Sequence, residues 1–347
     1  MRGTFIKHCL AVLGISLAVA TVAPAAEAQG RKFSIVIGST SFAFFPIYVA
    51  HGSGFFKDEG LDVDIVNVPA NATPVAAILS GNADIAGLGT QAAFSALDKG
   101  QPLRIVMPIM NEYTSTIFAH KDVLKQKGVS RQSPLKDRVE AMRGLKLAST
   151  AIGAGPHLMY KYLFAKYANG TDVDKVAEVV PIGNAGETLA GMQRGIVHVS
   201  AFSPPVAEKA VADGFAEILI DFIGGDVPEI KGSVYIILAA TEEKLKRDPE
   251  GVRAFIRAMH RANQLAKTDL MKAGEAAQPF MRNMQSDLYG LGVKAIGPAL
   301  PTEPTVSVDG LKRFMSLLEV GGYKYKVDYE KAIANDLVKQ AIAEAKK

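Results

Sequence analysis

The first part of the chain alternates short apolar runs with helical stretches. Pro46 suits the first turn of one helix, and Thr73 followed by Pro74 suits the start of a second. Thr90 is placed to cap a third helix over 91–99. The alternation predicts a mostly parallel sheet with helices on both faces. The strand-like runs lie at 34–37, 62–66, 84–88 and 103–107.

The same order of elements returns about 110 residues later. Pro156 again opens a helix after a strand-like run, as Pro46 does in the first part. Gly195 and Gly214 end helices as Gly81 and Gly100 do. We interpret the agreement as two lobes of similar build, although two generic βα units could also match by chance. The second set of strand-like runs lies at 145–148, 178–180, 196–200 and 217–220.

From residue 241 onward the pattern is mainly helical. Asp248 and Pro249 are suited to cap and begin a long amphipathic helix that runs to about residue 267. Two further helices are predicted over 307–318 and 329–346, whereas 286–305 is rich in Gly and Pro and is predicted to be loop. We expect this part to pack against the first lobe.

The N-terminus has the composition of an export signal. Arg2 and Lys7 precede an uncharged apolar run over 9–23, and Ala26-Glu27-Ala28 fits the small-x-small pattern at a cleavage site. The run is shorter than the ~20 residues that a membrane-spanning helix needs. An uncleaved anchor is the alternative. We expect a signal peptide over 1–28, cleavage near Ala28 and a periplasmic product.

The amino-acid composition narrows the set of possible functions further. Of 347 residues, 48% are hydrophobic and 21% are charged, as in ordinary globular proteins. The net charge of +4 is spread along the chain, so no basic patch for nucleic acid is predicted. Cys9 is the only cysteine, which excludes disulfides within the chain and a metal site built from several cysteines. We predict no cofactor and no metal.

Four loops are placed where an open parallel sheet binds ligands, beyond the carboxyl ends of strands and near helix N-termini. The loops at 38–46, 87–91, 148–157 and 200–205 contain no Lys, Arg, Asp or Glu. Hydroxyl and backbone N–H groups there suit a polar or singly charged head group, and phenylalanines suit an apolar body. The hydroxyls could equally cap helices, and the rings could be core. The predicted ligand contacts are Ser39, Thr40, Ser41, Phe42, Phe44, Thr90, Gln91, Ser149, Thr150, Gly153, Gly155, His157, Phe202 and Ser203.

Signatures of enzymes are missing from the sequence. No G-x-S-x-G, G-K-[ST] or H-E-x-x-H motif occurs. Gly153-Ala154-Gly155 begins a dinucleotide fingerprint, but Leu158 stands at the third glycine position and Pro156 lacks the N–H that a phosphate needs. These observations argue against catalysis and against nucleotide binding.

Three stretches resemble a known family: PIYVA at 46–50, GFFKDEGLDV at 54–63 and LSGNADIA at 79–86. They are similar to the substrate-binding proteins of ABC importers for nitrate, aliphatic sulfonates and taurine, and to the related binders of thiamine-pyrimidine precursors. The resemblance implies an α/β fold of the type II periplasmic-binding-protein class, with two βα lobes, parallel-rich sheets and a two-segment hinge. It implies a ligand site between the lobes, formed by the loops named above.

The sequence and the resemblance together predict an extracytoplasmic solute-binding component of an ABC importer. We expect lobe 1 to comprise 29–112 and 230–347, and lobe 2 to comprise 113–229. The expected partners are a small organic solute (a sulfonate, a carboxylate or a polar heterocycle), an ABC permease and its ATPase, with the binding protein itself a monomer. The alternatives are an enzyme on the same fold, of a pyrimidine-forming or transferase type, and a periplasmic ligand sensor.

Overall fold

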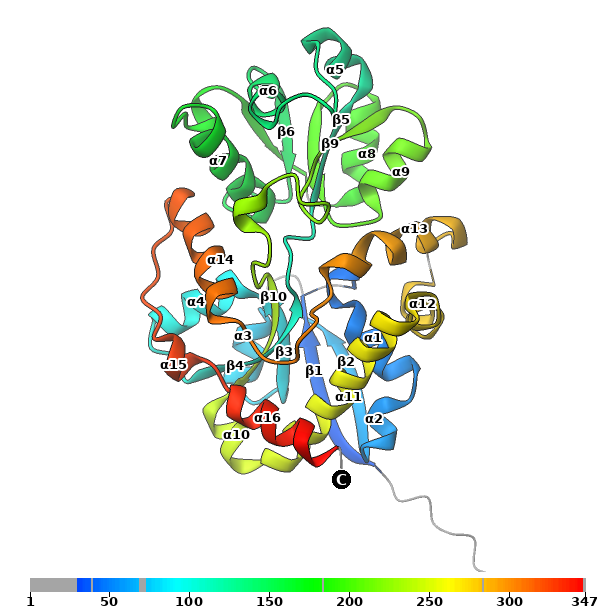
Figure 1. Cartoon of the computed structure of the whole chain (residues 1–347), viewed down its shortest axis with the longest axis vertical. Coiled ribbons are helices and arrows are strands. Elements are labelled where there is room, and N and C mark those ends of the chain that lie inside the picture. The colour runs from blue at the N-terminus through cyan, green and yellow to red at the C-terminus, as the bar shows by residue number, and fades with distance from the viewer. Residues whose placement is uncertain (1–29, 39, 69–72, 183, 283, 346–347) are drawn as a thin grey trace, which may run out of the picture.

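The chain forms two α/β lobes, one above the other, in a computed structural model of the protein (Figure 1). The structure describes residues 30–38, 40–68, 73–182, 184–282 and 284–345. The predicted signal peptide lies outside the described residues. Each lobe is built on one five-stranded sheet.

The sheet of lobe 1 has the strand order β2-β1-β3-β10-β4. β1 pairs in parallel with β2 and β3, whereas β10 is antiparallel to β3 and β4. β10 comes from a distant part of the sequence and closes this sheet after the chain returns from lobe 2 (Figure 1). The strands are β1 (Arg31–Ile37), β2 (Leu61–Asn67), β3 (Ile85–Gly89), β4 (Leu103–Met110) and β10 (Ile236–Thr241).

The sheet of lobe 2 repeats this design with the order β7-β6-β8-β5-β9. β6 is parallel to β7 and β8, and β5 is antiparallel to β8 and β9. In each sheet the second-last strand is therefore the antiparallel one. The predicted fold class, two βα lobes with parallel-rich sheets, is confirmed. The strands are β5 (Thr116–His120), β6 (Lys146–Ser149), β7 (Glu178–Pro181), β8 (Val199–Phe202) and β9 (Ala216–Asp221).

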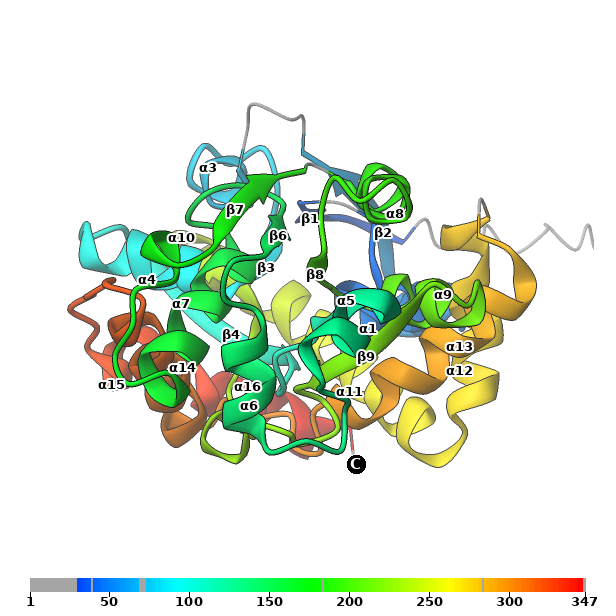
Figure 2. The ribbon, with the colours of Figure 1, turned by 90° about the horizontal axis from the view of Figure 1, so that it is seen from above.

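Helices cover both faces of each sheet (Figures 1 and 2). In lobe 2 these are α5 (Lys121–Lys127), α6 (Leu135–Ala141), α7 (Gly155–Tyr167), α8 (Ala185–Gln193) and α9 (Val206–Ala212). The first helices of lobe 1 are α1 (Phe45–Gly52), α2 (Phe55–Asp58), α3 (Pro74–Leu79) and α4 (Thr90–Asp98). The later ones are α10 (Glu242–Arg247), α11 (Pro249–Thr268), α12 (Leu270–Ala277), α13 (Ser286–Ile296), α14 (Val308–Val320), α15 (Tyr329–Ala332) and α16 (Asn335–Glu344).

Alternation along the strands divides the apolar residues between the two faces. Leu147 belongs to the core shared with α6 and α7, whereas its neighbour Ala148 belongs to the core beneath α8 and α9. In lobe 1, Val36 belongs to the core on one face of the sheet and its neighbour Ile35 to the core on the other face. The core on the α7 face of lobe 2 is continuous with the core on the α4 and α14 face of lobe 1. Apolar packing therefore extends from one lobe to the other.

Two predicted helix starts are confirmed by their caps. The Thr73 hydroxyl accepts a hydrogen bond from the Ala76 N–H at 3.2 Å, and the Asp248 carboxylate accepts one from the Gly251 N–H at 2.9 Å. Within the described ranges, no helix has the length and apolarity that a membrane crossing requires.

Two predictions for the C-terminal part are wrong. The stretch 286–305 was expected to be loop, but Ser286–Ile296 is a helix, because Tyr289, Val293 and Ile296 form a buried face at helical spacing. The helix expected over 329–346 is interrupted at Ile333, which forms a bridge with Ile105 of β4. The N–H of Ala334 donates to the Ile105 carbonyl at 2.9 Å, and this pairing requires extended backbone.

Candidate functional site

Two chain segments connect the lobes, one between β4 and β5 and one between β9 and β10 (Figure 1). The Glu112 carboxylate in the first accepts hydrogen bonds from the Gly232 N–H in the second at 3.1 and 3.0 Å. Burial raises the pKa of Glu112, and the Gly232 N–H, Lys231 and Arg313 only partly oppose that rise. The segments are thus joined to each other as well as to the sheets. The lobe boundaries at 113 and 229 stay a prediction.

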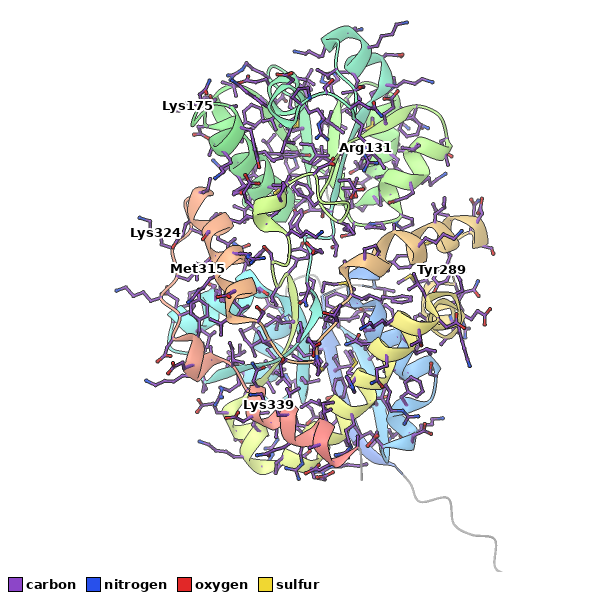
Figure 3. All side chains as sticks on the ribbon, in the orientation of Figure 1. Arg131, Lys175, Tyr289, Met315, Lys324 and Lys339 are labelled. Atoms are coloured by element: carbon purple, nitrogen blue, oxygen red, sulfur yellow. The ribbon has the colours of Figure 1, made fainter. Side chains whose placement is uncertain are left out.

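In lobe 1, the loop before α1 uses its phenylalanines as core. Phe42 is 1% exposed, and its ring lies 5.4 Å from that of Tyr289 on α13, which Figure 3 labels. Phe44 is buried against Gly87, where an added Cβ would lie 3.1 Å from the Phe44 ring. The two rings hold the loop on lobe 1, and the ligand contacts predicted at Phe42 and Phe44 stay a prediction.

The polar residues of that loop differ in how exposed they are to a ligand. Ser39 lies outside the described residues. Thr40 is exposed, and its hydroxyl accepts a hydrogen bond from the Asn67 side chain at 3.1 Å. Ser41 is partly buried, with its N–H 3.4 Å from the Tyr48 hydroxyl. Thr40 and Ser41 stay candidate contacts.

Thr90 begins α4 instead of capping it, since Gly89 occupies the N-cap position. The Thr90 side chain is fully buried, and its hydroxyl donates to the Val234 carbonyl at 2.8 Å. The hydroxyl therefore fixes α4 to the returning segment, and the ligand contact predicted at Thr90 stays a prediction. Gln91, one residue on, is partly buried with its amide 3.5 Å from the Tyr325 hydroxyl, and it stays a candidate.

In lobe 2, two predicted contacts are engaged within the loop before α7. The buried Ser149 hydroxyl donates to the Ala151 carbonyl at 2.9 Å. His157 is 2% exposed, its Nδ1 accepts from the Gly153 N–H at 2.8 Å, and its Nε2 lies 2.8 Å from the Asp174 carboxylate. Both ring nitrogens are used within lobe 2, and the ligand contact predicted at His157 stays a prediction.

The remaining predicted contacts lie at the end of β8 and beside α7. Phe202 and Ser203 are partly buried, and the Ser203 hydroxyl is 3.1 Å from that of Thr114 in the first connecting segment. Thr150 is exposed. Gly153 and Gly155 lie beside tyrosines of the connecting segments and of lobe 1.

A group of tyrosines, absent from the predicted set, meets the two glycines. A Cβ added at Gly155 would lie 3.4 Å from the Tyr113 hydroxyl and 3.5 Å from the Tyr235 hydroxyl. A Cβ at Gly153 would lie 2.9 Å from the Tyr323 hydroxyl. The tyrosines come from both connecting segments and from the chain after α14. Nothing in the local sequence signals their convergence, because it depends on how the connecting segments pair.

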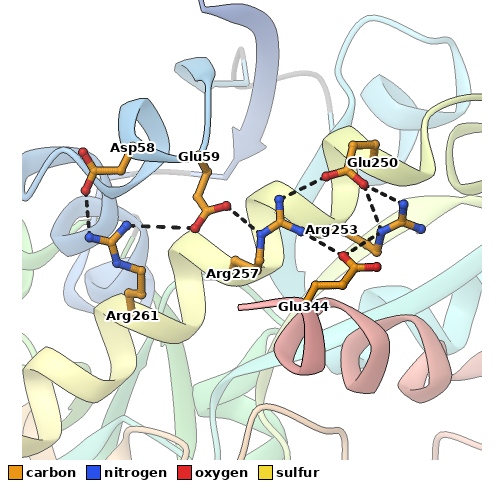
Figure 4. Close-up of polar contacts among 7 residues, drawn as sticks. All are labelled: Asp58, Glu59, Glu250, Arg253, Arg257, Arg261 and Glu344. Carbon is orange, nitrogen blue, oxygen red and sulfur yellow. Dashed lines mark hydrogen bonds and ion pairs between the residues drawn. The ribbon is translucent and has the colours of Figure 1, made fainter. Parts of the chain in front are cut away.

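Among the described residues, an extended charged cluster lies elsewhere, on the side of lobe 1 away from lobe 2 (Figures 1 and 4). Arg257 on α11 pairs with Glu59 at 2.6 Å, with Glu250 at 3.1 Å and with Glu344 at 3.1 Å. A hollow of about 720 Å³ adjoins the cluster. Since Glu59 directly follows α2 and Glu344 lies on α16, we interpret the cluster as a clamp that holds α2 and α16 on α11. Among the described residues, no group of three or more side chains could hold a metal ion.

Solved structures of periplasmic binding proteins share the fold of this chain. A protein of Bordetella bronchiseptica RB50 is 20% identical with a TM-score of 0.73, covering 92% of this chain and 99% of that one. The aliphatic sulphonate binding protein SsuA of Escherichia coli is 16% identical with a TM-score of 0.67, covering 89% and 99%. The nitrate-binding protein NrtA of Synechocystis PCC 6803 is 14% identical with a TM-score of 0.65, covering 91% and 89%.

The family itself follows from the sequence. The model of the NMT1-like family matches residues 39–280, which is more than half of the chain. This chain belongs to the NMT1-like family. A relative in Bacillus subtilis, provisionally named binding protein YtlA, is 24% identical over 256 residues, covering 72% of this chain and 70% of the relative.

Proposed function

We propose that the protein is the extracytoplasmic solute-binding component of an ABC importer and that it has no enzymatic activity. The observation that carries the proposal is the pair of similar lobes joined by two connecting segments, with tyrosines of those segments and of lobe 1 lying beside Gly153 and Gly155 of lobe 2. Membership of the NMT1-like family and the fold shared with sulfonate-binding and nitrate-binding proteins support it. The solute would be a small organic molecule held between the lobes.

The proposed mechanism is closure of a hinged clamp. A ligand that touches both lobes has more contacts in the closed form, so it shifts the population toward closure. The closed form would then dock on a membrane permease with its ATPase and release the solute there. We propose that the working protein is a periplasmic monomer, freed from its signal peptide near Ala28.

Solution scattering and a ligand screen test the clamp together. We expect a thermal-shift screen of carboxylates, sulfonates, nitrate and pyrimidines to identify compounds that raise Tm, because binding to the folded state alone stabilises it. The same compounds should reduce the radius of gyration, since closure brings the lobes together. A compound that binds tightly without changing the radius would contradict the clamp. Turnover of a bound compound would contradict the non-enzymatic role.

A further inference from the structure

The N-terminus of α7 in lobe 2 lacks the groups that usually satisfy a helix start. Ala154 occupies the N-cap position and has no side chain that could accept a hydrogen bond. Pro156 contributes no N–H, and the Leu158 N–H is bonded to the Ala154 carbonyl at 3.0 Å. Within the described residues, this leaves the N–H groups of Gly155 and His157 without a backbone acceptor. Two donors at the positive end of a 13-residue helix are therefore unused.

An unpartnered hydroxyl lies next to the first residue of this helix. Tyr113 is 2% exposed, and its hydroxyl has no hydrogen-bond partner among the described residues. That hydroxyl and the one of Tyr235 are the atoms nearest to a Cβ built at Gly155, at 3.4 and 3.5 Å. A buried hydroxyl without a hydrogen-bond partner raises the free energy of the folded, ligand-free protein. A ligand oxygen that accepts its hydrogen bond would remove that free-energy cost.

Both hydroxyls can act only as neutral donors or acceptors at ordinary pH. Burial raises the pKa of Tyr113 well above its usual range, with Tyr235 adding to the rise; Ser115 opposes it but is not in hydrogen-bond geometry. Burial raises the pKa of Tyr235 to about 12. The surroundings are aromatic, since the Tyr113 ring lies 4.7 Å from that of Tyr235 and 5.1 Å from that of Phe222. Such surroundings strengthen hydrogen bonds to a charged acceptor.

We propose that Tyr113, Tyr235 and the N-terminus of α7 form a seat for the head group of the solute, and that this head group is a singly charged carboxylate. The inference rests on the proposed solute-binding function and adds the substrate class. The proposed seat offers four donors: the two hydroxyls, which lie next to Gly155, and the N–H groups of Gly155 and His157. A carboxylate presents two oxygens with about four lone-pair sites, which these donors can satisfy. No lysine or arginine joins the seat, so a doubly charged phosphate would lack the charged partners it normally requires.

Two variants separate this role from a structural one. Tyr113→Phe removes an unpartnered hydroxyl, so the ligand-free protein should be as stable as the original or more stable, whereas carboxylate binding should weaken about tenfold or more. Gly155→Ala fills the space in front of the hydroxyls at ordinary van der Waals distance and at a first helical position that tolerates alanine. It should fold normally and also lose at least about tenfold in affinity.

Matched controls are available in the same chain. Tyr329→Phe changes a partly buried tyrosine on α15, away from α7, and Gly290→Ala adds a methyl in open space on α13. Neither should change affinity. The probes are acetate, methanesulfonate and acetamide, with benzoate, benzenesulfonate and benzamide as a larger set, each titrated calorimetrically into the full mature chain.

Each possible result of these titrations either supports or overturns the proposal. The proposal requires that a carboxylate binds better than the matched sulfonate and amide, and that both site variants weaken it. It is overturned if no carboxylate binds, if the matched sulfonate or amide binds equally well, or if both site variants keep the original affinity. Should another compound close the lobes and bind both variants unchanged, the seat is wrong while the solute-binding function stands. Should no compound close the lobes, the proposed function itself fails.

Discussion

The hydroxyl groups of Thr90 and Ser149 show how folding decides which polar side chains remain available. The sequence predicts both in loops beside helix starts, and in the structure Thr90 is the first residue of α4 and Ser149 the last residue of β6. The Thr90 hydroxyl bonds to Val234, 144 residues away, and the Ser149 hydroxyl bonds two residues along its own loop. Sequence predicts the loops, but the first of these bonds depends on where a distant segment packs. For the same reason the tyrosines at 113 and 235 were not predictable as neighbours of Gly155.

Glu208 on α9 carries a prediction about pH. One of its carboxylate oxygens is buried without a partner among the described residues, in a hollow of about 200 Å³ that Asp221 and Lys294 also line. Burial raises the pKa of Glu208, with Asp221 adding to the rise and the residue's own N–H opposing it. An acid whose pKa is raised on folding binds more protons in the folded state, so its stability contribution falls as pH rises through the folded pKa.

Glu208→Gln, which stays neutral, should therefore be more stable than the original protein at pH 7, by roughly 1 kcal/mol. The difference should shrink toward pH 4, where the unfolded chain also protonates the carboxyl. Urea unfolding at both pH values measures this, with the exposed Glu217→Gln on β9 as the control that should show no such difference. A loss of stability at pH 7 in Glu208→Gln would indicate that the carboxylate is usefully paired, with Lys294 the nearest cation in the hollow.

At the scale of elements, periodicity predicted eight of the ten strands in the described residues and most helices, and it failed where glycine replaces an apolar residue. α13 carries Gly290 and Gly292, which weaken its helical pattern in the sequence. Gly292 is required by packing, because the Phe42 ring occupies the place of a side chain. The antiparallel strands β5 and β10 were also missed as part of the repeat. Their partners are fixed by the crossing between lobes, which no local pattern reports.

Gly292→Ala should destabilise lobe 1. The added Cβ would lie 2.6 Å from the Phe42 ring, which is itself packed between Phe45 and Tyr289 and has little room to move. Overpacking of this kind costs about 1–3 kcal/mol. Gly290→Ala in the same helix meets open space and should stabilise by roughly 0.5–1 kcal/mol. Urea unfolding of the two variants should thus shift in opposite directions, and equal shifts would show that α13 does not rest on Phe42 as described.

At the scale of the whole molecule, the two lobes share one continuous apolar core. It passes from the sheet of lobe 1 through α14 to α7 of lobe 2. Leu158 on α7 is 2% exposed and lies against Gly321 at the end of α14, where an added Cβ would be 3.3 Å from it. Closure of the proposed clamp must preserve this contact, so rotation would occur about the α7–α14 side and not by full separation of the lobes.

The shared core predicts that both lobes unfold together. Calorimetry of the original protein should show one transition with equal calorimetric and van't Hoff enthalpies. Leu158→Ala should lower Tm, because burying a leucine there contributes about 2–5 kcal/mol, and should make the two enthalpies diverge as the contact between lobes weakens. Leu163→Ala, fully buried on the same helix, is the control. Leu163→Ala should also lower Tm. Its calorimetric and van't Hoff enthalpies should differ less than those of Leu158→Ala. Two separate transitions in the original protein would show that the lobes fold independently and that the contact at Leu158 does not couple them.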